Sequence, residues 1–356
     1  MPPKKSQHYV PRHYLAFFNN GDRTGHLPIY HLESGSEFEE RIANLCTRNY
    51  FYEEGRNLED KFTKVENEYL PVLQKIRETK SIDNLSKSDL QNLGGFLLFQ
   101  HARTRGMRIA LEEIIREFGE RVAKGELEQD MPDESLKLIR SDPSQFSQKL
   151  HLRKLFDAFS QSLLLKGLDL LLLKNESSSE FIGGDHPIVL DNPYFRDKPD
   201  YAISQWESPG LQVFCPLGPD LLLILYDPEC YNPRREGNRI TVTDSAVVER
   251  INDLQLIHCL DLVYYSNPGR LEHLQERQEA LSEYISHPTH YFDEFNGDDL
   301  FGSDEEALEM PCNYISEYCP RLPFFRFRTG VDFRPSRHLE APFVRSSSLL
   351  MWDSMT

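Results

Sequence analysis

Apolar side chains recur at helical spacing in the first half of the chain and gather in short runs in the second. Between positions 58 and 79, residues three or four apart form one apolar stripe: Leu58, Phe62, Val65, Tyr69, Val72 and Ile76. Such a stripe predicts an amphipathic helix. Beyond Ser177-Ser178-Ser179, short apolar runs alternate with Gly, Pro and Asp, which is typical of strands and turns. Because helices precede strands, we expect an α+β fold, with long helices from the N-terminal half packed on a small mixed sheet from the C-terminal half.

Two further long helices are expected, one from Ser86 to about Lys124 and one over residues 145–175. Ser86-x-x-Asp89 resembles a capping box with Asp in place of Glu, and marks the start of the first of them. The remaining predicted elements are strands over 26–32, 181–182, 188–190, 211–214, 221–226 and 262–265, and helices over 244–258 and 271–285.

The charge balance limits the possible partners. Forty Lys and Arg against fifty-seven Asp and Glu give a net charge of −17, so affinity of the whole surface for nucleic acid or anionic membrane is not expected. The most apolar stretch, 163–173, is interrupted by charged residues and is shorter than the ~20 residues that span a bilayer. No apolar signal segment follows the first residues, and the six cysteines form no CxxC pair. We therefore expect a cytoplasmic protein with reduced thiols and no membrane association.

Composition changes near the C-terminal end. Residues 1–286 are expected to form one catalytic-type domain, and residues 287–310 an acidic linker. Residues 311–356 form an extension in which arginines and phenylalanines interleave. Basic charge beside aromatic rings suits nucleic-acid binding, whereas core packing of the rings with solvated arginines is the alternative. Its candidate nucleic-acid contacts are Arg321, Arg326, Arg328 and Arg334.

Several polar residues fall where apolar ones are expected. His8, beside Pro11, is suited to act as a general base or metal ligand, and the alternative is a structural histidine in an aromatic cluster. Gln100 and Thr104 fall on the buried face of the second long helix, with Arg103 beside them. Buried polar groups need partners, so these residues form either a wall of a polar pocket or a buried structural network.

Two carboxylates are candidates for binding. Glu66 borders the stripe of the first helix, where it can pair with Arg103 or bind a cationic substrate group. Asp185 lies in the loop Gly183-Gly184-Asp185-His186-Pro187, where backbone can approach a ligand, and the alternative is a turn capped by its own Asp. The sequence contains no GxxxxGK[ST], GxSxG or HExxH motif, and no convincing GxGxxG. No cofactor and no metal site are therefore expected.

Six motifs, taken in order, resemble a widespread domain of unknown function whose hallmark is an N-terminal His-x-Val-Pro-x-x-Tyr-Leu. They span about residues 6–285 and are Gln-His-Tyr-Val-Pro-Arg-His-Tyr-Leu (7–15), Val65-Glu66, Gln100-x-x-Arg103-Thr104, Asp185-x-Pro187, Pro216-Leu217-x-Pro219-Asp220 and Asn252-x-Leu254-Gln255. The best-described members of that family are similar to the arginine-containing cyclodipeptide synthases of secondary metabolism. Those enzymes join arginyl-tRNA and a second aminoacyl-tRNA into a cyclo(Arg-Xaa) diketopiperazine.

The resemblance implies a reaction that needs no ATP, because an aminoacyl ester is already activated. The protein must hold two esters together, deprotonate the attacking amine and stabilise an oxyanion. His8 is then a candidate base, Glu66 or Asp185 a clamp for the arginine guanidinium, and Gln100 and Arg103 parts of the same catalytic pocket. Aminoacyl-tRNAs are the implied partners, with the arginines of the extension against the tRNA acceptor end.

One feature of those synthases has no counterpart here. Their acidic DDxxE motif is not matched, since Asp298-Asp299 lacks the glutamate and Glu305-Glu306-x-x-Glu309 has the wrong first two residues. Two other classes remain open: a nuclease-like effector on RNA or DNA with the same five residues around one pocket, and a non-catalytic binding module in which they only stabilise the fold. The second amino acid and the oligomeric state are left open by the sequence.

Overall fold

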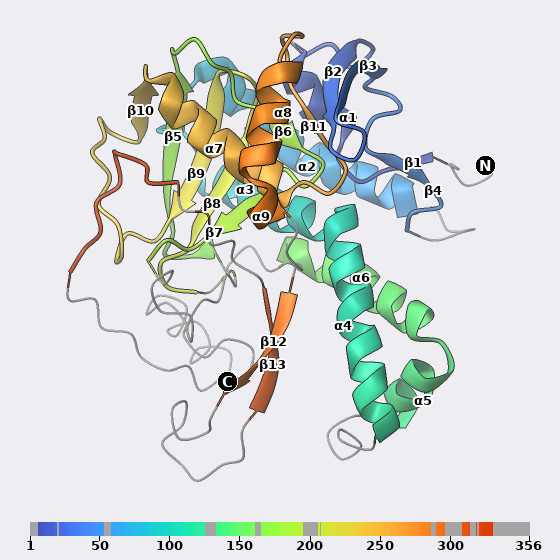
Figure 1. Cartoon of the computed structure of the whole chain (residues 1–356). Helices are drawn as coiled ribbons and strands as arrows, with labels where there is room; N and C mark the ends of the chain where they lie inside the picture. The colour runs from blue at the N-terminus through green and yellow to red at the C-terminus, as the bar shows by residue number, and fades with distance from the viewer. Residues whose placement is uncertain are drawn as a thin grey trace.

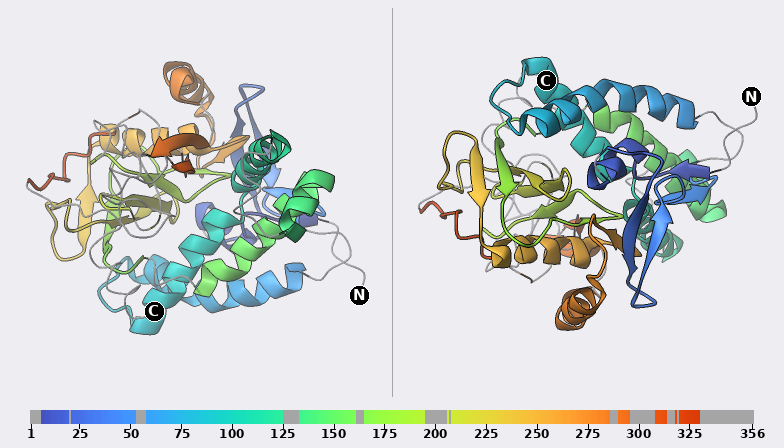
Figure 2. Two further views of the ribbon diagram at one scale, coloured as in Figure 1. Left: turned by 90° about the horizontal axis from the view of Figure 1, so that it is seen from below. Right: turned by 90° about the horizontal axis from the view of Figure 1, so that it is seen from above.

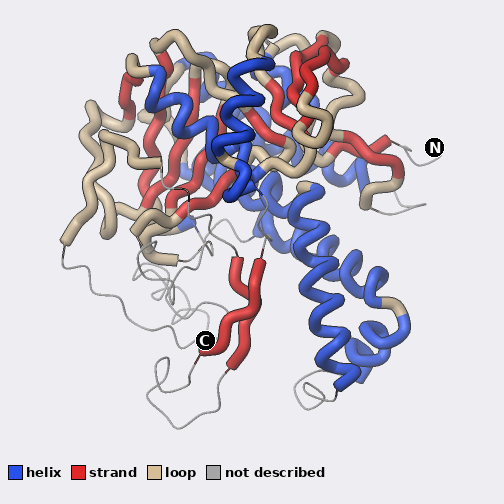
Figure 3. Tube along the Cα trace, in the orientation of Figure 1, coloured by secondary structure: helices blue, strands red, loops and turns tan. Residues whose placement is uncertain are grey.

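The chain folds as an α+β protein, as its pattern predicts (Figure 1). The computed structural model describes residues 6–19, 21–52, 58–124, 133–160, 165–194, 206, 208–285, 290–295, 308–313, 318 and 320–329. A body that contains two sheets and several helices carries a projecting arm of helices (Figure 3).

The larger sheet is buried on both faces. Its strands, in spatial order, are β10 (Arg239–Val242), β5 (Asp169–Asn175), β9 (Leu221–Tyr226), β8 (Gln212–Pro216) and β7 (Val189–Asp191). β10 pairs with β5 in parallel and the other pairs are antiparallel. Along β5, Leu171 and Leu173 face one apolar core and Leu172 faces another, as the two-residue period of a strand requires. Burial on both sides explains why the central strands are apolar at nearly every position.

Helices cover the two faces of this sheet (Figure 2). α7 (Ser245–His258) lies on one face, and α2 (Leu58–Thr79) and α3 (Lys87–Ala102) lie on the other. α2 has the bounds that the apolar stripe predicts. The predicted capping box is also confirmed, because Ser86 and Asp89 each accept a hydrogen bond from the other's backbone amide at the start of α3.

A second, antiparallel sheet lies beside the first. Its strands, in spatial order, are β3 (Ser36–Arg41), β2 (His26–His31), β11 (Leu262–Tyr264) and β6 (Gly183–Gly184). The chain opens with β1 (Ser6–His8), which pairs with β4 (Thr47–Asn49), and continues into α1 (Arg12–Leu15) and the short helix η1 (Ala16–Phe18). The predicted strand over 181–182 is displaced to β6, which begins at the next residue.

The long helix predicted from Ser86 to Lys124 is wrong in one respect, because it is broken. α3 ends at Ala102 and α4 (Arg105–Lys124) begins three residues later. Thr104 Oγ1 accepts from the amide of Met107 at 3.5 Å, so it caps the start of α4 in the manner of an N-cap residue. The break leaves Arg103 at the end of α3, with its side chain fully buried.

The helix predicted over 145–175 is wrong in its second half. α6 (Pro143–Ser160) is helical, but residues 169–175 are the strand β5. A continuous apolar run fits a buried helix or a buried strand equally well. Gly167, at φ +90°, favours a chain reversal, and pairing with β9 selects the strand.

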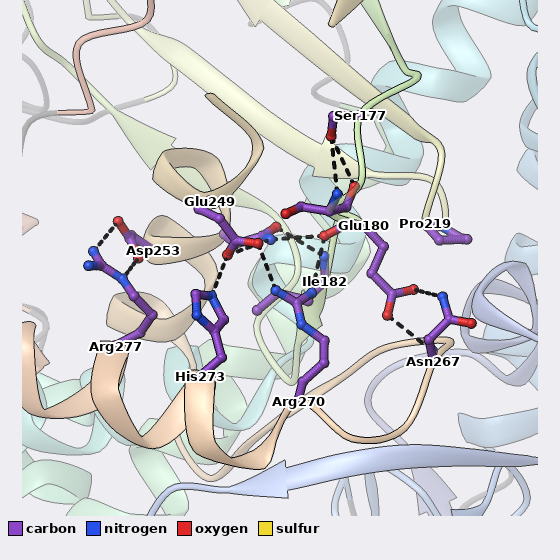
Figure 4. A network of polar contacts seen from close by, with 12 residues as sticks. Ser177, Glu180, Ile182, Pro219, Glu249, Asp253, Asn267, Arg270, His273 and Arg277 are labelled. Atoms are coloured by element: carbon purple, nitrogen blue, oxygen red, sulfur yellow. Dashed lines mark hydrogen bonds and ion pairs between the residues drawn. The ribbon is translucent and has the colours of Figure 1, made fainter. Parts of the chain in front are cut away.

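α4, α5 (Asp133–Ser141) and α6 form the projecting arm. On the body, α8 (Leu271–Ala280) and α9 (Ser282–Ile285) replace the single helix predicted over 271–285. Ion pairs attach α8 to α7 (Figure 4): Glu249 accepts from Arg270 at 2.8 Å and lies 2.9 Å from the His273 ring, and Asp253 pairs with Arg277 through both oxygens.

Toward the C-terminus, β12 (His290–Phe295) and β13 (Leu308–Asn313) form an antiparallel hairpin. Most of the predicted acidic linker, including residues 296–307, lies outside the described residues. Among the helices in the described ranges, none combines the length and apolar character that crossing a bilayer requires.

Candidate functional site

The N-terminal signature is part of the core. From His8 to Leu15, every residue except Arg12 is buried. Its rings pack against helix residues, as with Tyr14 and Phe96, whose centroids are 5.7 Å apart. The Tyr14 hydroxyl also donates to the carbonyl of Pro216, which belongs to another of the family motifs. The signature is therefore a buried connection between the sheets and the helices.

Arg103 is the centre of a buried polar network. Its guanidinium donates to Glu66 Oε1 at 2.6 Å, to the carbonyl of His8 at 2.6 Å and to the Tyr52 hydroxyl at 3.0 Å. The Phe99 ring lies 5.0 Å from its central carbon. This geometry confirms the predicted pair of Glu66 with Arg103. Glu66 thus already holds a guanidinium, that of the protein's own Arg103.

Burial and charge set the protonation states of this network. Burial opposes the charge on Arg103, but Tyr52, Glu66 and Tyr69 outweigh it and raise the arginine pKa above its ordinary value. Burial, with the positive charges of Arg12 and Arg103, lowers the pKa of His8 to about 4. His8 is therefore neutral at pH 7, and its Nε2 accepts from Arg12 at 3.3 Å. This occupied, weakly basic nitrogen fits the structural alternative for His8 better than the role of a base.

Gln100 and Arg103 fix the backbone of the signature. Gln100 Nε2 donates to the carbonyl of Tyr9 at 3.0 Å, one residue beyond the carbonyl that Arg103 holds. The amide of Tyr9 donates to the carbonyl of Cys46 at 3.0 Å. Hydrogen bonds therefore hold both the amide and the carbonyl group of Tyr9.

Asp185 holds a different segment. Its two oxygens accept from the amides of Leu260 and Asp261, at 2.7 and 3.0 Å, just after α7. The alternative of an Asp that caps its own turn is therefore wrong, because the capped backbone is about seventy-five residues away in sequence. Burial raises the pKa of Asp185 to about 7, although both amide donors act in the opposite direction.

Two side chains of α7 form hydrogen bonds with the backbone of the loop that carries Asp185. Asn252 Oδ1 accepts from the amide of Ile182 at 3.1 Å, and Gln255 Oε1 accepts from the amide of Gly184 at 2.9 Å. Gln255 Nε2 also donates to the carbonyl of Pro187 at 3.3 Å. The polar residues of the last motif thus position Asp185, which in turn positions Asp261.

Both fixed segments border one cavity of about 620 Å³. It lies between the β1–β4 ribbon and the sheet formed by β3, β2 and β11. Tyr9 and Asp261 are among its lining residues. The other lining residues that can contact a ligand through charge, a ring or a polar group include His31, Phe38, Glu40, Asn44 and Arg48. Asp261 pairs with Arg105 and, at 3.8 Å, with Arg48.

The predicted site residues therefore fall into two sets. His8, Glu66, Gln100 and Arg103 come together in the network that holds Tyr9, whereas Asp185 contacts none of those four among the described residues. None of the five lines the cavity. They position the residues that do.

Sequence reasoning missed the lining residues themselves. One face of the β2–β3 hairpin carries three of them, His31, Phe38 and Glu40. The sequence predicted only the strand over 26–32, so its alternation could have indicated the face of His31 but not those of Phe38 and Glu40. Nδ1 of His31 is buried and has no hydrogen-bond partner among the described residues. Among all residues that the structure describes, no three His, Cys, Asp or Glu side chains lie close enough together to ligate one metal ion.

The arginines of the extension are partly described. Arg321, Arg326 and Arg328 are exposed, and Arg334 lies outside the described residues. Phe324 is buried in the core beneath α7, as the core-packing alternative predicts, but Phe327 is 54% exposed.

The fold and the site define an α+β protein whose sequence motifs surround and position one cavity. Residues 6–269 match the family model described as a protein of unknown function (DUF4238), and the chain belongs to this family. No curated protein and no solved structure matches the chain.

Proposed function

We propose that this protein is an arginine-containing cyclodipeptide synthase that uses arginyl-tRNA and a second aminoacyl-tRNA to form a cyclo(Arg-Xaa) diketopiperazine. The chemistry comes from the resemblance of the six motifs. The observation that supports it is the convergence of motif residues from separate segments on Tyr9 and Asp261, on two sides of one cavity. A cavity of about 620 Å³ is within the range of small-molecule sites, about 300–1,000 Å³.

The lining of the cavity offers partners for an arginyl group. Glu40 supplies a carboxylate for charge-assisted hydrogen bonds to a guanidinium, whereas Asp261 already pairs with Arg105 and Arg48. Tyr9 and Phe38 supply aromatic faces, on which a guanidinium stacks. Arg48, which lies 3.8 Å from Asp261 and has a half-exposed side chain, can contact a phosphate of the terminal nucleotide. In this proposal Glu40 replaces Glu66 and Asp185 as the guanidinium clamp.

The proposed reaction consists of two aminolysis steps. The α-amine nitrogen of one aminoacyl group attacks the ester carbonyl carbon of the other, so that a C–N bond forms and the C–O bond to the tRNA ribose breaks. His31, which lines the cavity, accepts the amine proton and returns it to the departing ribose oxygen. A second, intramolecular aminolysis closes the ring and releases the other tRNA.

The test is synthesis by the purified protein. Supplied with arginyl-tRNA and a mixture of other aminoacyl-tRNAs, it is expected to release a cyclic dipeptide that mass spectrometry identifies as cyclo(Arg-Xaa). Glu40→Gln removes a charged acceptor and is expected to lower the rate by about 10- to 100-fold, the value of a charge-assisted hydrogen bond of about 1.5–3 kcal/mol.

The matched control is Glu39→Gln, the neighbouring residue of β3, which does not line the cavity. It is expected to leave the rate unchanged. If no aminoacyl-tRNA mixture gives a cyclic dipeptide, the proposed function is wrong. Equal rates for the two variants would reject the role of Glu40 and leave the reaction itself standing.

A non-catalytic binding module is the second candidate. It is favoured by the internal pairing of Arg103, Glu66 and Asp185, whose charged groups bind other parts of the chain. For this candidate, arginine or an arginyl ester would bind the cavity in isothermal titration while no product forms.

A further inference from the structure

The C-terminal segment 320–329 docks along the loop that precedes β10. Three backbone hydrogen bonds of 2.8 Å join them: Asn232 to Arg326, Arg234 to Phe324, and Arg328 to Cys230. Leu322 and Phe324 are buried in the core beneath α7. The Arg250 side chain also donates to the carbonyl of Arg321 at 2.9 Å. The segment is thus fixed by its backbone and by two apolar anchors.

This docking concentrates positive charge. Residues 230–240 and 320–329 together contain six arginines and one acidic residue, Glu236, in a chain whose net charge is −17. Arg235 is neutralised by Asp169 at 3.3 Å. The five other arginines of these segments are exposed. Arg239 belongs to β10, and we call the remaining four the arginine face: Arg234, Arg321, Arg326 and Arg328. The face exists only because two segments about ninety-five residues apart in sequence pair with each other.

An exposed ring accompanies the charges. Phe327 is 54% exposed, and its centroid lies 6.0 Å from that of Tyr194 and 5.4 Å from that of Tyr231. Guanidinium groups bind phosphates through paired hydrogen bonds, and exposed rings stack on unpaired bases. Phosphate binders beside a stacking ring fit RNA better than an acidic protein or a lipid surface.

We infer that the arginine face binds the phosphates of the tRNA substrate at a distance from the cavity, an inference that rests on the proposed function for the identity of the RNA. Residues 320–329 follow the loop before β10 on the left of Figure 1, whereas the β2–β3 hairpin, which contributes lining residues of the cavity, lies at its upper right. The tRNA acceptor end therefore belongs at the cavity and the arginine face contacts the body of the tRNA. This inference differs from the sequence-based expectation, in which the extension contacts the acceptor end.

The test measures binding of fluorescently labelled, deacylated tRNA to the full-length protein by anisotropy over a series of salt concentrations. R326E/R328E is expected to weaken binding by at least about tenfold and to reduce the slope of log K against log salt by about 2, since each phosphate contact contributes about 1. The matched control is R116E/R140E, which reverses two exposed arginines on the projecting arm. It makes the same change in net charge and is expected to shift affinity less than twofold.

The outcomes separate this inference from the proposed function. Equal tRNA affinity for the two double variants would overturn the arginine face, whether or not wild-type protein makes a cyclic dipeptide. Selective loss of tRNA binding without any synthesis by wild-type protein would keep the face and reject the synthase. Binding of phosphatidylserine vesicles in place of tRNA would overturn the assignment to RNA. Equal melting temperatures of wild type and both variants exclude unfolding as the cause.

Discussion

The buried polar side chains of this protein form hydrogen bonds with backbone groups that are far away in sequence. Asp185 illustrates this at the residue scale, because its carboxylate accepts two amides from residues 260 and 261 while it is almost completely buried. Two amide donors favour the ionised form, and burial favours the neutral form. Burial has the larger effect, so the pKa rises to about 7.

A pH dependence follows for Asp185. Between about pH 4 and pH 7 the folded protein retains a proton that the unfolded chain has lost, so this residue's contribution to stability falls as pH rises through that window. As pH rises from about 4 to about 7, the free energy of unfolding of wild type minus that of Asp185→Asn is therefore expected to decrease, by on the order of 1.4 kcal/mol per pH unit at most. Above pH 7 this difference is expected to level off. Urea denaturation at each pH measures it. An increase across the window would show that the amide donors outweigh burial.

At the scale of elements, the end of α3 joins the N-terminal ribbon to α2. The break after Ala102 directs Arg103 toward His8 of β1 and Glu66 of α2 at once. A buried arginine with three partners stabilises the packing only while all partners are present. The same network holds Tyr9 at the cavity through its neighbour Gln100.

Arg103→Met is expected to lower the free energy of unfolding by about 3–5 kcal/mol, because it leaves the Glu66 carboxylate and the His8 carbonyl without their donor. Denaturant titration monitored by circular dichroism measures the loss. The control is Arg116→Met on α4, whose side chain is 65% exposed, with an expected change within about 0.5 kcal/mol. A comparably small loss for Arg103→Met would contradict a stabilising network.

At the scale of the whole molecule, charge is unevenly distributed. The net charge of −17 implies mutual repulsion over most of the surface, while the arginine face gathers positive charge at one end. Salt screens exposed charges over about 10 Å at 0.1 M, so it weakens this repulsion more than it weakens buried ion pairs.

Raising NaCl from about 0.01 to about 0.15 M is therefore expected to raise the melting temperature by a few degrees, as differential scanning calorimetry measures it. The binding of tRNA is expected to change in the opposite direction and weaken over the same range. A melting temperature that falls with salt would show that exposed ion pairs such as Arg116 with Glu120 stabilise the fold more than the net charge destabilises it.

The sequence by itself determined the α+β class, the bounds of α2 and the capping box at Ser86. These features depend on local periodicity and local capping signals. The pairing of Glu66 with Arg103 was one of two alternatives open from the sequence, and the tertiary structure selected it. The break at Thr104 and the strand 169–175 were decided by the tertiary structure, because a threonine and the run of leucines at 170–173 are each compatible with a continuing helix. The cavity and the arginine face were decided there as well. Both form where segments far apart in the chain meet, and spacing within one segment carries no information about which distant segment will lie beside it.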